Sequence, residues 1–92
     1  MNFVRETNRI YLNNTEGHMI AEVIFPAVNG ETVDIERTFV DSSLQGQGIA
    51  GALMQEAAGY LRETHRKARL TCSYAVSWFA RHPEQADILD RA

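Results

Sequence analysis

A glycine-rich turn lies between an apolar strand pattern and an amphipathic helix pattern, and it constrains this sequence most. The turn is Gln45-Gly46-Gln47-Gly48-Ile49-Ala50, and an apolar run from Ile35 to Val40 precedes it. At such a turn, the first backbone N–H groups of the helix have no intrahelical acceptor and lie at the positive end of the helix dipole. Glycines leave no Cβ atom to keep a bulky phosphate away from those groups. The turn therefore predicts a binding site for a phosphorylated ligand.

Three phosphate-binding patterns can be compared with this turn. A P-loop requires Lys and then Ser or Thr after its last glycine, whereas Ile49 and Ala50 follow here. A dinucleotide-binding turn is followed by a strand that ends in an acidic residue, whereas the next predicted strand ends at Cys72. The third pattern is Gln/Arg-x-x-Gly-x-Gly/Ala, and residues 45–50 match it at every defined position.

This third pattern resembles the acyl-CoA-binding motif of the GNAT superfamily of N-acetyltransferases. The resemblance to short, single-domain GNAT-like proteins extends over roughly the last two-thirds of the chain, at residues 38–41, 44–54, 72–75, 78–79 and 81–84. It implies that backbone amides of the turn wrap the CoA pyrophosphate. The cofactor-binding residues that it implies are Phe39, Val40, Gln45, Gly46, Gln47, Gly48, Ile49 and Ala50.

The function that the resemblance implies is transfer of an acetyl group from acetyl-CoA, as cosubstrate, to an amine acceptor. The alternative is a non-catalytic acyl-CoA-binding module, which needs the glycine turn but no catalytic residue. Full-length GNAT enzymes place a strand and two helices before the strands predicted here, and 92 residues leave no room for them. We therefore expect an open acceptor site, suited to a small-molecule or protein amine, or a site completed in a homodimer.

The hydrophobic pattern predicts an α+β fold in a single domain spanning residues 1–92: an antiparallel strand meander, then a helix, a roughly parallel strand and terminal helices. The resemblance implies that this is a minimal GNAT-like fold. Glycine, proline and asparagine mark its turns. In chain order, we expect strands at 3–5, 9–12, 18–25 and 32–41, a helix at 47–65, a strand at 68–72, a helix capped by Ser73 with Ala75, Val76 and Phe79 inward, and a short helix at 84–89.

The strand predicted at 32–41 has an irregular side-chain alternation. Val33, Ile35 and Phe39 share one face in strict alternation, but so does Arg37, while Thr38 lies on the other face with Val40. This register indicates a β-bulge, which frees backbone groups for other partners. In the following helix, we expect Gly51 and Gly59 to allow close packing against the sheet.

Two residues are candidates for catalysis. Cys72 lies at the C-terminal end of a predicted strand, beside a helix N-terminus, and this placement can lower the pKa of a thiol. Lone cysteines are, however, also common as inert core residues. The resemblance implies either an acyl-enzyme role for Cys72 or a place in the wall of the acyl pocket. GNAT enzymes use a tyrosine to protonate the departing CoA thiolate, which makes Tyr74 the second candidate, with an aromatic anchor as the alternative.

Arg37 stands where related short sequences have histidine, and a guanidinium cannot act as a base. A base would then come from Glu36 or a water molecule. We expect His82, before Pro83, to bond carbonyls at a helix end rather than to act on a substrate. The three histidines and Cys72 have no metal-ligand spacing, so no metal site is expected.

Bulk properties favour a folded cytoplasmic protein. The chain is 45% hydrophobic with a net charge of −3 and no basic stripe, so nucleic acid is not an expected partner. No stretch is long and apolar enough to span a membrane, and no signal-peptide pattern opens the sequence. One cysteine cannot form an internal disulfide, which agrees with a reducing compartment.

Overall fold

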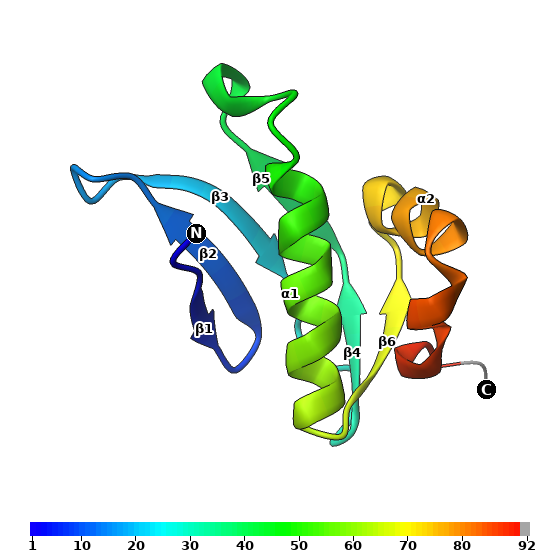
Figure 1. Ribbon diagram of the computed structural model, residues 1–92. Helices are drawn as coiled ribbons and strands as arrows, with labels where there is room; N and C mark the ends of the chain where they lie inside the picture. The colour runs from blue at the N-terminus through cyan, green and yellow to red at the C-terminus, as the bar shows by residue number, and fades with distance from the viewer. Residues whose placement is uncertain (91–92) are drawn as a thin grey trace.

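A computed structural model describes residues 1–90, and its elements confirm the α+β pattern (Figure 1). Helix α1 lies across one face of the sheet, and helix α2 lies beside the last strand (Figure 1). The elements are β1 (Val4–Glu6), β2 (Arg9–Asn13), β3 (Met19–Ile24), β4 (Thr32–Ile35), β5 (Arg37–Val40), the 3₁₀ helix η1 (Ser42–Leu44), α1 (Ile49–Glu63), β6 (Lys67–Leu70), α2 (Ser73–Arg81) and the 3₁₀ helix η2 (Pro83–Ile88).

The strands form an antiparallel group and a parallel pair. The antiparallel group has the order β1-β2-β3-β5, and β4 pairs with β6 in parallel from Thr32↔Lys67 to Ile35↔Leu70. Parallel neighbours require a long connection, which α1 provides between β5 and β6. The predicted meander and the parallel last strand are both confirmed. Among residues 1–90, no helix is long and apolar enough to cross a membrane.

The core lies between α1 and the inner face of the sheet. The helical spacing in α1 buries Leu53, Met54 and Leu61 completely, as the apolar pattern predicts. Val23 of β3 and Phe25, directly after this strand, are equally buried and belong to the same core. Burial of each such side chain stabilises the fold by about 1.5–3 kcal/mol relative to its exposure.

The predicted bulge is present, and Glu36 is its extra residue. Ile24 pairs with Arg37, and three residues later along the same segment Ala27 pairs with Val33, which is four residues before Arg37. The second segment therefore contains one residue more than its partner between these pairs, which defines a β-bulge. Glu36 also interrupts the strand predicted at 32–41 and divides it into β4 and β5.

The bulge changes which side chains of β5 face the core. Thr38 pairs with Val23 and Val40 with Ala21, and both partners are fully buried on the inner face. Phe39 does not share the inner face, and its expected alignment with the core residues of β4 is wrong. One additional residue reverses the alternation beyond the bulge.

The start of α1 differs from the prediction in a way that matters for the turn. The helix begins at Ile49 rather than at residue 47, and Gly48 is its N-cap residue. Gly46 and Gly48 both adopt left-handed backbone conformations, with φ of 87° and 76°. Gln47 consequently belongs to the turn and not to the helix.

The glycines inside α1 have other roles than those expected. A Cβ atom at Gly59 would meet no atom within 4 Å, so the prediction that this glycine allows close packing against the sheet is wrong. A Cβ atom at Gly51 would meet Trp78 and Tyr74 of α2, so this glycine faces a helix rather than the sheet.

The second helix also differs in detail. Cys72 occupies the N-cap position, so the expected capping role of Ser73 is wrong. Val76 is 51% exposed, contrary to its predicted inward position, whereas Trp78 and Phe79 are buried. His82 ends the helix as expected, because its Nδ1 lies 2.7 Å from the carbonyl oxygen of Trp78.

Candidate functional site

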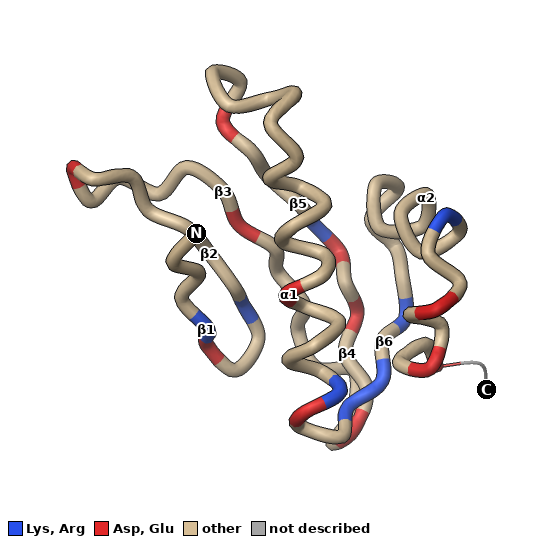
Figure 2. Tube along the Cα trace, in the orientation of Figure 1, with Lys and Arg blue, Asp and Glu red and all other residues tan. Residues whose placement is uncertain are grey.

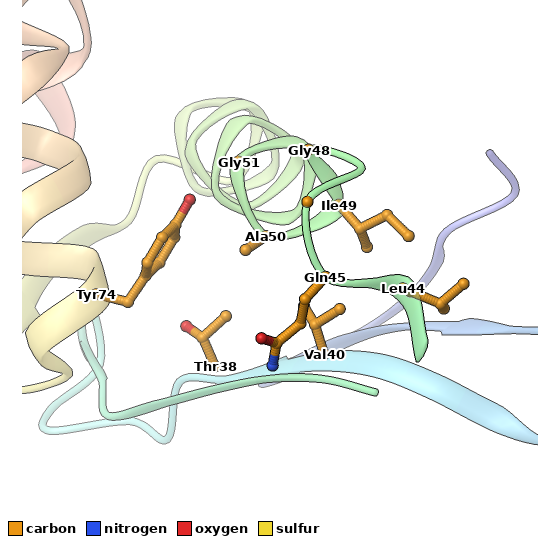
Figure 3. Close-up of a pocket in the computed structure, with 10 residues that line it drawn as sticks. Thr38, Val40, Leu44, Gln45, Gly48, Ile49, Ala50, Gly51 and Tyr74 are labelled. Atoms are coloured by element: carbon orange, nitrogen blue, oxygen red, sulfur yellow. The ribbon is translucent and has the colours of Figure 1, made fainter. Parts of the chain in front are cut away.

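A cleft of about 420 Å³ lies between β5, the glycine turn and the first residues of α2 (Figure 3). The side chain of Tyr74 extends from α2 toward α1, and Thr38 and Val40 form the floor (Figure 3). The lining residues are Thr38, Val40, Leu44, Gln45, Gly46, Gly48, Ile49, Ala50, Gly51 and Tyr74.

The turn presents backbone donors that the protein itself leaves unused. Within residues 1–90, the hydrogen bonds include no acceptor for the N–H groups of Gly46, Gly48, Ile49, Ala50 and Gly51. The N–H of Ala52 is the first in α1 that bonds, to the carbonyl of Gly48. The 15-residue helix adds the positive end of its dipole, equivalent to about half an elementary charge, at the same place.

Charged side chains contribute little to this cleft. None of its lining residues is Lys, Arg, Asp or Glu. Figure 2 shows the tube without charged residues from the segment after Asp41 into the first turns of α1. Attraction of an anion must therefore come from oriented N–H groups and the helix dipole rather than from cationic side chains.

The outer edge of β5 supplies further backbone groups. The N–H of Asp41 bonds to the carbonyl of Ile20, so alternate residues from Asp41 backwards direct their backbone groups toward β3. Phe39 is one of these residues. The N–H and C=O groups of Thr38 and Val40 point away from β3, and Val40 lines the cleft. An extended ligand can therefore bond to this edge.

Cys72 lies next to the cleft without lining it. Its sulfur is 3.4 Å from Oγ1 of Thr38, which does line the cleft. Burial alone would raise the pKa of the Cys72 thiol, but hydrogen bonding from the Thr38 hydroxyl and from the N–H groups of Ala75 and Tyr74 outweighs it. The pKa of Cys72 consequently lies below its usual range, which favours the nucleophilic thiolate.

The cleft unites most of the residues singled out from the sequence. Seven of them line it: Val40, Gln45, Gly46, Gly48, Ile49, Ala50 and Tyr74. Phe39 and Gln47 do not belong to the lining, and Arg37 lies on the opposite face of the sheet, beside Ile24. Within residues 1–90, no cluster of three or more potential metal ligands occurs.

Sequence reasoning missed three residues of the cleft: Thr38, Leu44 and Gly51. Thr38 could have been found from the suspected bulge, because one inserted residue moves it, together with Val40, to the face of the core residues of β4. No comparable sequence pattern identifies Gly51, whose role depends on the approach of α2.

The sequence model of the family described as GCN5-related N-acetyl-transferase matches residues 9–88, a segment that contains the whole cleft. The chain belongs to the GCN5-related N-acetyltransferase family. Protein NATD1 of Xenopus tropicalis is 33% identical over 66 residues, which cover 72% of this chain and 61% of that protein. The chain thus spans less than two-thirds of the length of this family relative.

Solved structures share the GCN5-related fold. A GCN5-like protein from Staphylococcus aureus has 24% sequence identity and a TM-score of 0.78, covering 97% of this chain and 87% of that one. The GNAT family N-acetyltransferase YhbS from Escherichia coli, solved in complex with CoA, has 26% identity and a TM-score of 0.64. The matched region covers 70% of this chain and 39% of YhbS.

Proposed function

We propose that this protein is an acetyl-CoA-dependent N-acetyltransferase that binds its cosubstrate in the cleft between β5 and α1. One observation carries the proposal: the N–H groups of Gly46 and of Gly48 to Gly51, which have no acceptor within residues 1–90, belong to residues that line a cleft of about 420 Å³. Family membership supports the acetyl-CoA assignment, as does the CoA complex of the related YhbS.

The cleft provides complementary groups along its length. The turn amides are donors for the pyrophosphate of CoA, and Gly46 and Gly48 allow it to approach the backbone. The backbone groups of Val40 suit the amides of the pantetheine arm, which would lie along β5 as an added strand. This direction leads from the turn toward Thr38 and Tyr74, where the thioester would lie beside Cys72.

Two chemical routes fit this arrangement, and they differ in the role of Cys72. In direct transfer, the amine attacks the thioester carbonyl and loses a proton to a base such as water, while the C–S bond breaks and Tyr74 donates a proton to the departing CoA thiolate. In the covalent route, the Cys72 thiolate attacks first and forms an acetyl-cysteine thioester while CoA leaves. The amine then attacks this thioester and releases the Cys72 thiolate. The acceptor is an amine, small or part of a protein.

Calorimetric titration with CoA tests the binding site. Gly48→Glu places a negative side chain among the turn donors, at a left-handed position, and abolishes binding on this proposal. Gly17→Glu is the matched control, because Gly17 has a similar φ of 83° and does not line the cleft. Absence of CoA binding to the wild-type protein would overturn the proposed function.

Intact-protein mass spectrometry after incubation with acetyl-CoA separates the two routes. An acetyl adduct that disappears in Cys72→Ala supports the covalent route. Acetylation of an added amine by Cys72→Ala at the wild-type rate supports direct transfer. A protein that binds acetyl-CoA but acetylates no member of a broad amine panel would instead be the non-catalytic binding module.

A further inference from the structure

Among the described residues 1–90, the indole nitrogen of Trp78 has no hydrogen-bond partner, although the residue is almost completely buried. Trp78 is 4% exposed, packs edge-on against Phe79 and stacks on His82 with ring centroids 4.0 Å apart. These contacts explain the position of the ring. They do not explain the free Nε1–H, because buried indoles usually have an acceptor.

This nitrogen must still contact solvent. Among residues 1–90, no fully buried side-chain nitrogen or oxygen lacks a partner, so the unbonded Nε1 cannot be fully buried. A Cβ atom at Gly51 would lie 3.6 Å from Nε1, so the absence of a side chain at Gly51 leaves this side of the nitrogen uncovered. Gly51 and Tyr74 line the cleft and Trp78 itself does not, so the indole N–H lies behind Gly51, where no side chain covers it.

The hydroxyl group of Tyr74 is a second donor next to Gly51. The hydroxyl oxygen of Tyr74 would lie 3.7 Å from a Cβ atom at Gly51. Tyr74 and Trp78 are four residues apart on α2, so their side chains project from the same face of the helix. No hydrogen bond within residues 1–90 uses the Tyr74 hydroxyl, so both donors are available to a ligand.

We propose that Tyr74 O–H and Trp78 Nε1–H form a two-donor subsite, opened by Gly51, for an uncharged carbonyl oxygen of the bound acyl-CoA. The inference depends on the proposed function and names a contact within it. Both donors are neutral, and no cationic side chain lines the cleft. Two neutral donors suit the partial charge of a carbonyl oxygen, whereas a phosphate is better served by the turn N–H groups and the helix dipole.

The carbonyl has two sources: the thioester or an amide of the pantetheine arm. The sequence contains a single tryptophan, so a ¹⁵N-labelled protein gives one indole N–H resonance, which reports directly on Trp78. Titrations with CoA, acetyl-CoA and adenosine 3′,5′-bisphosphate separate the sources. A downfield shift with both CoA and acetyl-CoA assigns a pantetheine amide, and a shift with acetyl-CoA alone assigns the thioester.

Two results would overturn the subsite. One is an unchanged indole resonance while backbone amides of residues 46–51 shift with CoA, which would leave the proposed function intact. The other is an equal indole shift with adenosine 3′,5′-bisphosphate, which carries no carbonyl arm. If the amides of residues 46–51 do not respond to CoA either, the proposed function itself fails.

Gly51→Ala provides an independent test, because it covers both donors without removing them. The added methyl group fits at ordinary contact distances, and alanine is the better helix former, so the protein remains folded. We expect the affinity for the carbonyl-bearing ligand to fall about tenfold, as for the loss of one to two hydrogen bonds. Gly59→Ala, in the same helix with open space around it, should bind as wild type.

Trp78→Phe completes the set, since it removes the N–H but keeps an aromatic ring in the core. Affinity should fall several-fold, with the turn amides still responding to the ligand. Wild-type affinity in both Gly51→Ala and Trp78→Phe would contradict the subsite.

Discussion

Thr38 and Cys72 meet between β5 and the start of α2, with Oγ1 of Thr38 3.4 Å from the cysteine sulfur. The contact depends on the bulge at Glu36, since the extra residue moves Thr38 onto the inner face of the sheet. Without the bulge, the side chain of Phe39 would occupy this face. The β-bulge thus determines which side chain of β5 lies beside the thiol of Cys72.

Thr38→Val should raise the pKa of Cys72, because the hydroxyl that hydrogen-bonds the sulfur is lost while burial is unchanged. The pKa of this thiol is below its usual range in the native protein, so removal of a donor moves it upward. The pH dependence of alkylation by iodoacetamide measures the change. We expect the rate curve to move to higher pH.

Thr38→Ser is the rescue variant, since it retains the hydroxyl and should retain the wild-type curve. Thr71→Val is the matched control, because Thr71 donates its hydroxyl to Asp34 rather than to the thiol. A Thr38→Val curve that coincides with wild type would show that the hydroxyl does not act on Cys72.

Gly48→Ala should destabilise the protein by about 1–2 kcal/mol, because a Cβ atom is unfavourable at the left-handed φ of 76°. Urea denaturation measures the loss. Gly30→Ala is the control, since Gly30 does not have a left-handed backbone conformation and has open space around it. Equal midpoints for the two variants would contradict a conformational requirement at Gly48.

The apolar spacing of α1 was predictable because a long helix repeats its buried positions many times. Leu53, Met54 and Leu61 are all fully buried where the pattern places them. The glycine turn was equally readable, since its residues are adjacent in sequence. Local patterns thus located the helix and the glycine turn.

Features that depend on tertiary contacts were not predictable. The bulge was suspected from Arg37, but the faces beyond it depend on pairing with β3, which assigns Thr38 and Val40 to the core side. Val76 fits a helical apolar pattern, yet the short helix α2 turns Trp78 inward and leaves Val76 exposed. Gly51 owes its role to α2, which is distant in sequence.

Leu61→Ala should lower the free energy of unfolding by about 2–5 kcal/mol, because it creates a cavity at a fully buried site. Val76→Ala tests the corrected position on α2. Since Val76 is 51% exposed, its truncation should change stability by less than about 0.5 kcal/mol. Thermal or urea unfolding measures both, and a large loss in Val76→Ala would show that the residue is covered in solution.

Arg62→Gln should raise the pKa of Asp87, which its guanidinium holds below the usual range. Nε of Arg62 donates to a carboxylate oxygen of Asp87 at 2.7 Å, and this hydrogen bond is the main cause of the shift. NMR titration of the Asp87 carboxyl group measures the change directly. An unchanged pKa would mean that the pair is broken in solution.

The same pair gives a stability difference with a defined sign. A carboxyl whose folded pKa is lowered stabilises the fold above its unfolded pKa, about 3.9, and this contribution disappears as the pH falls through the folded pKa. The wild-type protein should therefore have a larger free energy of unfolding than Arg62→Gln at neutral pH, and this difference should become smaller below about pH 4. Both side chains are largely exposed, so the gap should stay under about 1 kcal/mol, and high salt should reduce it further.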